Sequence, residues 1–545
     1  MTPEQWISHD PDPVTAAELR ACNPAELAAR WAAPLRFGTA GLRGPVRGGP
    51  DAMNRAVVLR ASWAVAQVLG DHQHRGATVI VGRDARHGSA DFAIATAEVL
   101  AAKGFSVVML PNPLPTPVVA YAVRHTGAAA GIQITASHNP ATDNGYKVYF
   151  AGGRQIVSPI DTEIENAMAT APPADEIDRR HVSPAGTALV DRYIQRAAGV
   201  RRHHGEVRVA LTPLHGVGGQ LALDVLHAAG FTDIHTVTSQ FEPDPDFPTV
   251  AFPNPEEPGA TDALLDLAAE IDAEIAIALD PDADRCAVGV CGPNGWRMLT
   301  GNETGWLLGD YLLSQLSEAE AKTAVVASSV VSSRMLADIA LDYRARHVET
   351  LTGFKWLSRA DAAMPGASLA YAYEEAIGYC VDPDAVRDKD GISAAVLACD
   401  LVAALRDQGS CVGEQLDALA RRHGVHITDT VTRRVADVAE AAAVMTRLRA
   451  DPPSELAGFG VATRDLLRSA PPSSTSTTDA PTTDALEFTG ERDGTALRVV
   501  VRPSGTEPKL KCYLEVSRAP SQDVDAQRAI AATVCARLIE AVRRW

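Results

Sequence analysis

The chain has 545 residues, too many for one hydrophobic core, so its length predicts several domains of ordinary size. Hydrophobic residues make up 46% and charged residues 22%, a balance typical of soluble globular proteins, and the formal net charge is −18. Such an acidic chain is a poor general binder of nucleic acid, because phosphate backbones require excess lysine and arginine. Any bound anion must therefore be met by a few locally placed positive groups.

The compartment is predicted from the N-terminus, the apolar runs and the cysteines. Met1–Trp6 has no basic segment followed by an apolar stretch, so we expect no signal peptide, and no apolar run is long enough to span a bilayer. Eight cysteines without a CxxC pair indicate reduced, mostly structural thiols. We expect a cytoplasmic protein, a monomer or weak homodimer, that binds neither membrane nor nucleic acid.

Three stretches of the chain alternate short apolar strands with helices, the pattern of parallel α/β units. The predicted strands are Ala77–Val81, Ser106–Leu110, Val207–Leu211 and Ala324–Ala327. The predicted helices are Ser89–Lys103, a segment from Gly216–Gly219 to about Gly230, and Ser333–Tyr343. Their spacing, on the order of one small domain each, predicts three related α/β domains.

The C-terminal part has a different pattern, which predicts a smaller α+β domain. Leu497–Val501 and Lys509–Val516 are predicted to pair as strands, and Asp523–Trp545 is predicted to be a helix. Its expected apolar face is Ile530, Val534, Leu538 and Val542. A Ser/Thr/Pro tract at 469–485 is unsuited to packing and is expected to be a surface loop.

The first candidate site is "TASHNP" at residues 135–140, where an apolar strand ends in Ser137 and His138. Ser137 suits a nucleophile, although a strand end followed by an ordinary Asn-Pro turn is an equally good interpretation of this segment alone. A hydrolase triad is not indicated, because Gly-x-Ser-x-Gly is absent. Asp143-Asn144-Gly145 is a strong turn signal, and this turn is predicted to bring Lys147 back towards the serine.

The second candidate is "DPDADR" at residues 280–285, directly after the apolar strand Ile275–Leu279. In extended chain the carboxylates of Asp280, Asp282 and Asp284 fall on one face, where like charges are costly unless a cation lies among them. Oxygen ligands favour magnesium or manganese. A solvated acidic turn is the alternative, and the apolar flanking strands argue against it.

Three further segments carry polar groups that suit a sugar phosphate. "RPSGTEPK" (502–509) offers a guanidinium, hydroxyls, backbone N–H groups and an ammonium, a nest that suits a phosphate dianion. Between 352 and 392 lie "TGFKW", "YEEAIGY" and "RDKDGI". There Glu374 and Glu375 suit sugar hydroxyls, and Arg387 and Lys389 suit phosphate. A glycine-rich loop, "RFGTAGLRG" (36–44), contains Arg43. Taken singly, the alternatives are a basic hairpin turn and surface ion pairs.

Together and in this order, these motifs resemble the α-D-phosphohexomutase family, which includes phosphoglucomutase and phosphomannomutase. The resemblance runs from Phe37 to about Val516, and "GTAGLRG", "YEEAIGY" and "RDKDGI" are most similar to the longer branch, which also contains phosphopentomutases and glucose-bisphosphate synthases. It implies an α/β fold of four domains around a central cleft, three α/β domains and a C-terminal α+β domain. The expected boundaries are 1–204 (phosphoserine loop), 205–318 (metal loop), 319–428 (sugar loop) and 429–545 (phosphate loop).

The resemblance also implies a role for each motif. Ser137 would carry the phosphoryl group, and Asp280, Asp282 and Asp284, with a phosphoserine oxygen, would bind Mg²⁺. Arg43, His138, Lys147 and Lys389 match family positions that assist the transfer, and Arg285 would help to balance the charges. The substrate-binding residues implied are Arg285, Glu374, Glu375, Arg502, Ser504, Gly505, Thr506 and Lys509. Glucose 1,6-bisphosphate, or the matching sugar bisphosphate, is the implied activator.

The expected reaction moves a phosphoryl group between C1 and C6 of a hexose phosphate through phospho-Ser137 and a bisphosphate. One departure concerns the sugar: hexose-specific relatives commonly have Gly-Glu-x-Ser where this chain has Tyr373-Glu374-Glu375-Ala376. The missing hydroxyl leaves open a phosphopentomutase, and a glucose 1,6-bisphosphate synthase uses the same residues. A phosphatase with an Asp-x-Asp motif is disfavoured because Asp280 lies too late in the chain, and a catalytically dead sensor because Ser137 and all three aspartates are present.

Overall fold

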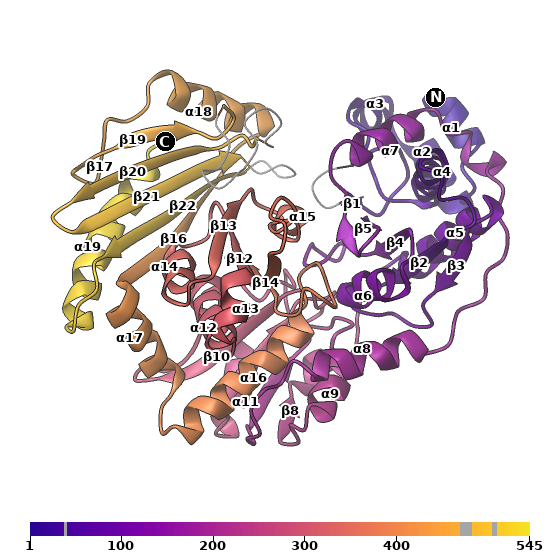
Figure 1. Cartoon of the computed structure of the whole chain (residues 1–545). Coiled ribbons are helices and arrows are strands. Elements are labelled where there is room, and N and C mark those ends of the chain that lie inside the picture. The colour runs from indigo at the N-terminus through magenta and orange to yellow at the C-terminus, as the bar shows by residue number, and fades with distance from the viewer. Residues whose placement is uncertain (38–40, 469–481, 504–508) are drawn as a thin grey trace. The chain divides into compact units, whose positions relative to one another are not determined.

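The computed structural model describes residues 1–37, 41–468, 482–503 and 509–545 (Figure 1). These residues form two compact units, which are described one at a time. The first unit is Met1–Met298 together with Gly378–Ala404, and the second is Leu299–Ile377 together with Leu405–Trp545. The chain therefore leaves the first unit after residue 298 and returns to it for a short segment.

The first sheet contains the strand that leads to Ser137. Its strands are β1 Leu42–Pro45, β2 Thr78–Arg83, β3 Ser106–Met109, β4 Ala130–Ile134, β5 Asp143–Phe150 and β6 Arg154–Gln155, in the order β1-β5-β4-β2-β3, with β6 beside β5. β2 is parallel to β3 and β4, as predicted. The helices near this sheet are α4 Arg55–Asp71, α5 Ser89–Ala102 and α6 Thr116–Thr126, preceded by α1 Pro3–Ser8, α2 Pro13–Ala21 and α3 Pro24–Ala32 and followed by α7 Ile160–Ala169 and α8 Ala188–Ala198. Apolar residues of α1–α5 and α7 form one core with the sheet.

The predicted turn at Asp143-Asn144-Gly145 is wrong, because these residues already belong to β5 and pair with β1. The Asn144 side chain is buried and donates to the His87 carbonyl at 2.8 Å instead of shaping a turn. A Cβ on Gly145 would lie 2.5 Å from the Thr135 oxygen and 2.8 Å from the Leu42 oxygen, so glycine permits three strands to approach here. The reversal of the chain lies earlier, between β4 and β5.

The second sheet, also in the first unit, carries the aspartates. Its strands are β7 Val209–Thr212, β8 Ile234–Thr236, β9 Ile275–Leu279, β10 Cys286–Gly292 and β11 Gly295–Met298, in the order β11-β10-β9-β7-β8, with α9 Gly219–Ala228, α10 Thr238–Phe241 and α11 Asp262–Glu270 between them. The expectation that residues 280–284 are extended is wrong. They form a turn in which the Ala283 N–H donates to the Asp280 carbonyl at 2.8 Å and Ala283 has φ 51°.

The returning segment, residues 378–404, is fixed to the first unit by buried carboxylates. Asp388 accepts hydrogen bonds from the Tyr149 hydroxyl at 2.9 Å and from Gln155 Nε2 at 2.7 Å. Asp390 accepts one from the Tyr193 hydroxyl at 2.8 Å, just before α16 (Gly391–Asp407) begins. Both aspartates flank Lys389, so this segment brings a lysine into the first unit.

The second unit contains two sheets of different type. In the first of them, β12 (Ala324–Ser329) lies parallel to and between β13 (Arg346–Thr350) and β14 (Ser368–Glu374). The helices of this part are α12 Gly301–Ser314, α13 Glu318–Thr323, α14 Met335–Asp342, α15 Phe354–Leu357 and α17 Val412–His423. The strand and helix predicted around residues 324–343 are confirmed as β12 and α14.

The last sheet is antiparallel and forms the C-terminal α+β domain. Its strands are β16 Val425–Arg434, β19 Ala462–Asp465, β20 Leu486–Arg492, β21 Thr495–Pro503 and β22 Lys509–Arg518, in the order β16-β22-β21-β20-β19, and β17 Glu455–Leu456 pairs with β18 Phe459–Gly460 nearby. Helices α18 (Val438–Ala450) and α19 (Val524–Val542) pack against it. On α19, Val534, Leu538 and Val542 are buried as predicted, whereas Ile530 is 42% exposed. Of the Ser/Thr/Pro tract at 469–485, residues 469–481 lie outside the described residues.

Two predictions about the whole chain can be compared with the structure. Among the helices that the structure describes, none is both long and apolar enough to cross a membrane. All eight cysteines are free, and five of them are buried. The fold class is confirmed: three α/β domains are followed by a C-terminal α+β domain.

Candidate functional site

The Ser137 loop (residues 135–143) connects β4 to β5 in the first unit and lies against the second sheet. Ser137 is 3% exposed, and its Oγ donates to Asp280 Oδ2 at 2.8 Å. The Oγ also lies 3.2 Å from Nδ1 of His138. The Ser137 backbone has φ 54°, in the left-handed region that L residues seldom adopt. This conformation directs the hydroxyl at the aspartates and not along the strand.

The three aspartates predicted as metal ligands are fully buried and close together. Each offers a carboxylate oxygen, and these oxygens lie within 4.8 Å of one another. Lys147 Nζ donates to Asp282 Oδ2 at 2.6 Å and to Asp284 Oδ2 at 2.8 Å. The lysine from β5 therefore binds two of the aspartates, whereas the sequence predicted its return towards the serine, and no turn at Asn144 brings it there.

The titratable groups of this cluster differ in the direction in which their pKa values are shifted. Burial, with the nearby Asp282 and Asp284, raises the pKa of Asp280 well above its usual value. Burial also acts to raise the pKa values of Asp282 and Asp284, but the partners of each carboxylate together outweigh it and lower both. These partners are Lys147 and Thr116 at Asp282, and Lys147, Lys389 and Arg285 at Asp284. For His138, burial and then the positive charges of Arg285 and Arg43 lower the pKa well below its usual value, which favours a neutral imidazole. The cluster therefore carries more carboxylates than its lysine can balance.

The donor set of this cluster fits a divalent cation such as Mg²⁺. Oδ1 of Asp282 and Oδ1 of Asp284 are buried and accept no hydrogen bond from any residue that the structure describes. A buried carboxylate oxygen without a donor is costly, and a hard cation satisfies such oxygens directly. Ser137 Oγ, at 2.8 Å from Asp280, lies close enough to belong to the same ligand set.

Three further predicted residues lie around the cluster. Lys389 Nζ lies 3.4 Å from Asp284 Oδ2. Arg285 Nε lies 4.0 Å from Asp284 Oδ1. Arg43 Nη1 donates to Asn139 Oδ1, on the Ser137 loop, at 2.9 Å. The first unit thus gathers every predicted catalytic and metal-binding residue, with positive groups on several sides of the serine.

Sequence reasoning missed two residues of this site. The Thr116 hydroxyl donates to Asp282 Oδ2 at 2.5 Å, from the start of α6. Asp388 precedes Lys389 and lies 3.7 Å from its Nζ. Nothing in the sequence marks Thr116, because a Thr-Pro pair at the start of a helix is an ordinary signal. The acidic residues on both sides of Lys389 were visible but have an equally common surface explanation.

The predicted sugar-binding glutamates lie in the second unit, at the end of β14, and have different surroundings. Glu374 is 9% exposed, and its Oε1 accepts a hydrogen bond from the Gly353 N–H at 2.6 Å. Oε2 of Glu375 instead accepts from the hydroxyls of Ser329 and Ser332, both at 3.0 Å. The two adjacent carboxylates therefore have different partners: Glu374 accepts a hydrogen bond from a backbone N–H, and Glu375 accepts hydrogen bonds from two serine hydroxyls of the same unit.

The predicted phosphate site is only partly described. Arg502 lies near the end of β21 and Lys509 at the start of β22, so both lie at the same end of this hairpin. The residues between them, including Ser504, Gly505 and Thr506, lie outside the described residues. The structure therefore places two positive residues beside that turn and leaves the nest itself as a prediction.

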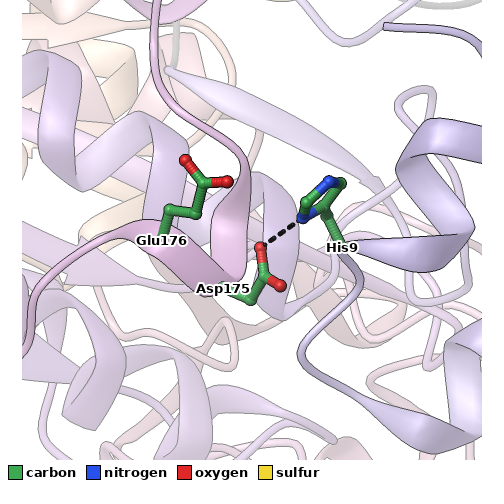
Figure 2. Close-up of side chains that lie close together, drawn as sticks. All are labelled: His9, Asp175 and Glu176. Atoms are coloured by element: carbon green, nitrogen blue, oxygen red, sulfur yellow. Dashed lines mark hydrogen bonds and ion pairs between the residues drawn. The ribbon is translucent and has the colours of Figure 1, made fainter.

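A second group of potential metal ligands lies near the N-terminus, and its explanation is simpler. Figure 2 shows His9, Asp175 and Glu176, with His9 Nδ1 2.9 Å from Asp175 Oδ1. Both carboxylates are exposed and the imidazole is partly so, unlike the buried aspartates after β9. One hydrogen bond accounts for this arrangement, so we assign no metal to it.

Comparisons with known proteins extend these observations to the whole chain. Family models described as phosphoglucomutase/phosphomannomutase match it in four consecutive segments: alpha/beta/alpha domain I at residues 34–174, domain II at 191–291, domain III at 300–423 and the C-terminal domain at 431–532. The chain belongs to the phosphoglucomutase/phosphomannomutase family. It is therefore an intramolecular phosphotransferase of the isomerase class.

The relatives of this chain have several different names. A protein named probable phosphomannomutase from Haemophilus influenzae is 40% identical over 482 residues, covering 87% of this chain and 95% of the relative. The phosphopentomutase of Mus musculus is 34% identical over 562 residues, covering 95% and 90%. Other relatives are named glucose 1,6-bisphosphate synthase and phosphoglucomutase. A crystal structure of parafusin, a phosphoglucomutase from Paramecium, has a similar fold, with a TM-score of 0.70, 17% identity and coverage of 93% and 95%.

Proposed function

We propose that this phosphomutase interconverts the 1- and 6-phosphates of a hexose, glucose or mannose or both, with Ser137 as the carrier of the phosphoryl group. The observation that carries this assignment is the position of Ser137 Oγ, 2.8 Å from a buried aspartate of a cluster suited to Mg²⁺. A hexose is supported by the relative of highest identity reported above, named as a probable phosphomannomutase. Glucose 1,6-bisphosphate, or the matching bisphosphate, is the proposed activator.

The first transfer moves the phosphoryl group from Ser137 to the sugar. The bond between phosphorus and Ser137 Oγ breaks, a bond from phosphorus to a sugar hydroxyl oxygen forms, and the proton lost by that hydroxyl is balanced by one taken up at the freed Ser137 Oγ. His138 Nδ1, 3.2 Å from Ser137 Oγ, is close enough to exchange a proton with that oxygen. Phosphoryl transfer demands mainly alignment and neutralised charge from a protein, and Lys147, Lys389 and Arg285 supply positive charge here.

Mg²⁺, when bound, would supply further charge neutralisation and orientation for the phosphoserine. We propose Asp280, Asp282, Asp284 and a phosphoserine oxygen as its ligands. The orphaned oxygens of Asp282 and Asp284 support this set.

The second transfer returns the other phosphate of the bisphosphate to Ser137, so each phosphate must in turn occupy the distal site. We propose that Arg502, Ser504, Gly505, Thr506 and Lys509 bind this phosphate. A guanidinium and an ammonium at one end of a hairpin recognise a dianion without recognising the sugar. Glu374 is the proposed contact to the sugar hydroxyls.

A phosphopentomutase acting on ribose or deoxyribose 1-phosphate is the second candidate, and a specific observation favours it. Ala376 lacks the hydroxyl that hexose-specific relatives commonly have, and several relatives are named phosphopentomutase. A glucose 1,6-bisphosphate synthase is the third, supported by relatives of that name.

The proposed domain boundaries, localisation and oligomeric state remain predictions.

The deciding experiment measures turnover of α-glucose, α-mannose, α-ribose and deoxyribose 1-phosphates with Mg²⁺ and a trace of glucose 1,6-bisphosphate, with free phosphate followed in parallel. A hexose preference supports the proposal, and a pentose preference supports the second candidate. The third candidate needs a separate phosphoryl donor, and accumulation of the bisphosphate once such a donor is added supports it. Ser137→Ala should lose turnover by a factor on the order of 10⁴ or more and keep its fold by circular dichroism. Undiminished turnover in that variant would overturn the assignment of Ser137.

A further inference from the structure

Arg86 is a buried arginine that neither the motifs nor the proposed chemistry uses. It lies in the loop between β2 and α5 of the first unit and is 4% exposed. Its backbone N–H donates to Asp84 Oδ1 at 2.9 Å, and its Nε lies 3.5 Å from Asp84 Oδ2. The base of this side chain is thus fixed by a carboxylate that is itself buried.

The guanidinium of Arg86 bonds to the backbone of the Ser137 loop. Nη2 donates to the carbonyls of Asn139 at 2.5 Å and Ser137 at 2.6 Å. Nη1 donates to those of Pro140 at 2.7 Å and Asp143 at 3.1 Å. One planar, permanently charged group therefore satisfies four carbonyl oxygens of a single loop, which a lysine ammonium cannot reproduce in the same plane.

These bonds act on a backbone that would not otherwise stay in place. Ser137 has φ 54°, which costs energy in a residue with a Cβ, and such conformations persist only where the surroundings determine them. The carbonyl that Arg86 binds at 2.6 Å belongs to Ser137 itself. Rotation of that residue to an ordinary φ would move its Oγ away from Asp280.

The guanidinium is also shielded from water. Phe247 belongs to the same unit, in the part that contains the second sheet, and is 3% exposed. Its ring lies 4.9 Å from Arg86 Cζ. A cation against an aromatic face keeps its in-plane N–H groups available for the carbonyls. Water is therefore excluded from competing for these four hydrogen bonds.

We propose that Arg86 is a positioning residue of the phosphoryl transfer: through the backbone of the Ser137 loop it keeps Ser137 Oγ in the strained conformation that faces the metal ligands. The inference rests on the proposed role of Ser137 as carrier. Arg86 does not touch the reacting atoms in this role. Its removal should misplace the carrier oxygen and leave the proposed sugar and phosphate contacts of the second unit intact.

The same unit offers a matched control in Arg60, on α4. Arg60 donates to the carbonyls of Met168, Ala171 and Pro172 at 2.9–3.0 Å, and its Cζ lies 5.9 Å from the Trp6 ring. It therefore has the same type of contact, with backbone carbonyls and an aromatic ring, but at a segment without proposed chemistry. Its substitution reports the effect of losing such a residue on stability alone.

The experiment compares Arg86→Met, Arg86→Lys and Arg60→Met with the wild type in kcat, KM for the best sugar phosphate and Tm. We expect Arg86→Met to lose about 100-fold in kcat with KM changed by less than about threefold, since a misplacement near 1 Å costs a factor of that order. Arg86→Lys should recover part of kcat, because an ammonium reaches some of the carbonyls. Arg60→Met should lower Tm and keep the wild-type kcat.

Two results would overturn the proposal. One is a folded Arg86→Met protein whose kcat equals that of Arg60→Met; the other is a loss confined to KM. If Arg86→Met does not fold, Arg86→Lys decides by the same criteria. Ser137→Ala is measured beside them: if it stays active, the proposed carrier fails, whereas an inactive Ser137→Ala with fully active Arg86 variants refutes only the role of Arg86.

Discussion

Lys147 shows how one side chain can serve both stability and a reaction. Its ammonium is buried, yet it binds two carboxylates, and although burial acts to lower its pKa, Asp282 and Asp284 outweigh this and raise it. Without this lysine, Asp282 would keep only the neutral Thr116 hydroxyl at 2.5 Å, and Asp284 only the more distant Lys389 and Arg285 at 3.4 and 4.0 Å, among the contacts that the structure describes. A buried ion pair adds little net stability, but removal of one member is costly because the other charge stays behind.

We predict that Lys147→Met lowers the free energy of unfolding of the first unit by about 3–5 kcal/mol, measured in urea with a chelator present. Added Mg²⁺ should restore more stability to this variant than to the wild type, because Lys147 then no longer competes with the cation for the two carboxylates. Lys103→Met is the control. Lys103 is exposed and contacts only the face of Trp63 among the interactions described, at 5.0 Å, so a loss under about 1 kcal/mol is expected. Equal losses in the two variants would contradict the prediction.

At the scale of elements, the end of β14 separates two neighbouring glutamates. Glu374 accepts a backbone N–H from Gly353, beside the start of α15. Glu375 accepts hydroxyl groups from Ser329 and Ser332, which follow β12. Ser332 is in turn bound by the C-terminal sheet, because Arg498 donates to the Ser332 carbonyl at 3.1 Å. Glu375 therefore fixes the end of β14 to a loop that the C-terminal domain also contacts.

We predict that substitution of Glu374 lowers mainly kcat/KM, whereas substitution of Glu375 lowers mainly the free energy of unfolding. Glu374→Gln keeps an acceptor for the Gly353 N–H but loses its charge, so kcat/KM should fall about 10- to 100-fold with little change in Tm. Glu375→Ala should lower the free energy of unfolding by about 1–3 kcal/mol, because two serine hydroxyls lose their acceptor, with kcat/KM per folded molecule nearly unchanged. The opposite pattern would show that Glu375 is the sugar contact.

Elements and residues differ in how far the sequence predicts them. The strand Ile275–Leu279 and the hairpin of β21 and β22 follow from apolar runs, and the structure confirms both. Two local conformations were wrong for one reason: the turn signal at Asn144-Gly145 and the extended chain at 280–284 are local preferences, which contacts from other strands override. Arg86 and Thr116 were missed because their partners lie 51 and 166 positions away. A single sequence contains no signal for such distances.

The whole second unit contains groups that make its stability depend on pH. Burial lowers the pKa of His347 to about 4 from its ordinary 6.5, beside the Ser328 hydroxyl at 2.8 Å. The unfolded chain therefore binds a proton that the folded unit excludes, so stability is full above pH 6.5 and falls as the pH drops towards 4. For Glu515, burial acts to raise the pKa, but His426 and Arg498 lower it to about 2, so a second loss begins below pH 4.5.

We predict that, between pH 7 and pH 5, the wild-type second unit loses about 1–2 kcal/mol more unfolding free energy than His347→Gln does. Glutamine keeps a polar partner for Ser328 but cannot be protonated in this range. Denaturant unfolding at the two pH values, followed by circular dichroism, measures the difference. Identical slopes for the wild type and His347→Gln would contradict the prediction.

The return of residues 378–404 to the first unit has a consequence for the order in which the enzyme matures. A ribosome makes Ser137, Lys147 and the three aspartates long before it makes Lys389 and the carboxylates beside it. Domains that are continuous in sequence can fold as they emerge, but this unit cannot be completed until residues 299–377 have also been synthesised. A nascent chain stopped after residue 298 would therefore contain the serine and the aspartates without Lys389 or the Asp388–Tyr149 bond. The site therefore gains Lys389 and the Asp388–Tyr149 hydrogen bond only late in translation.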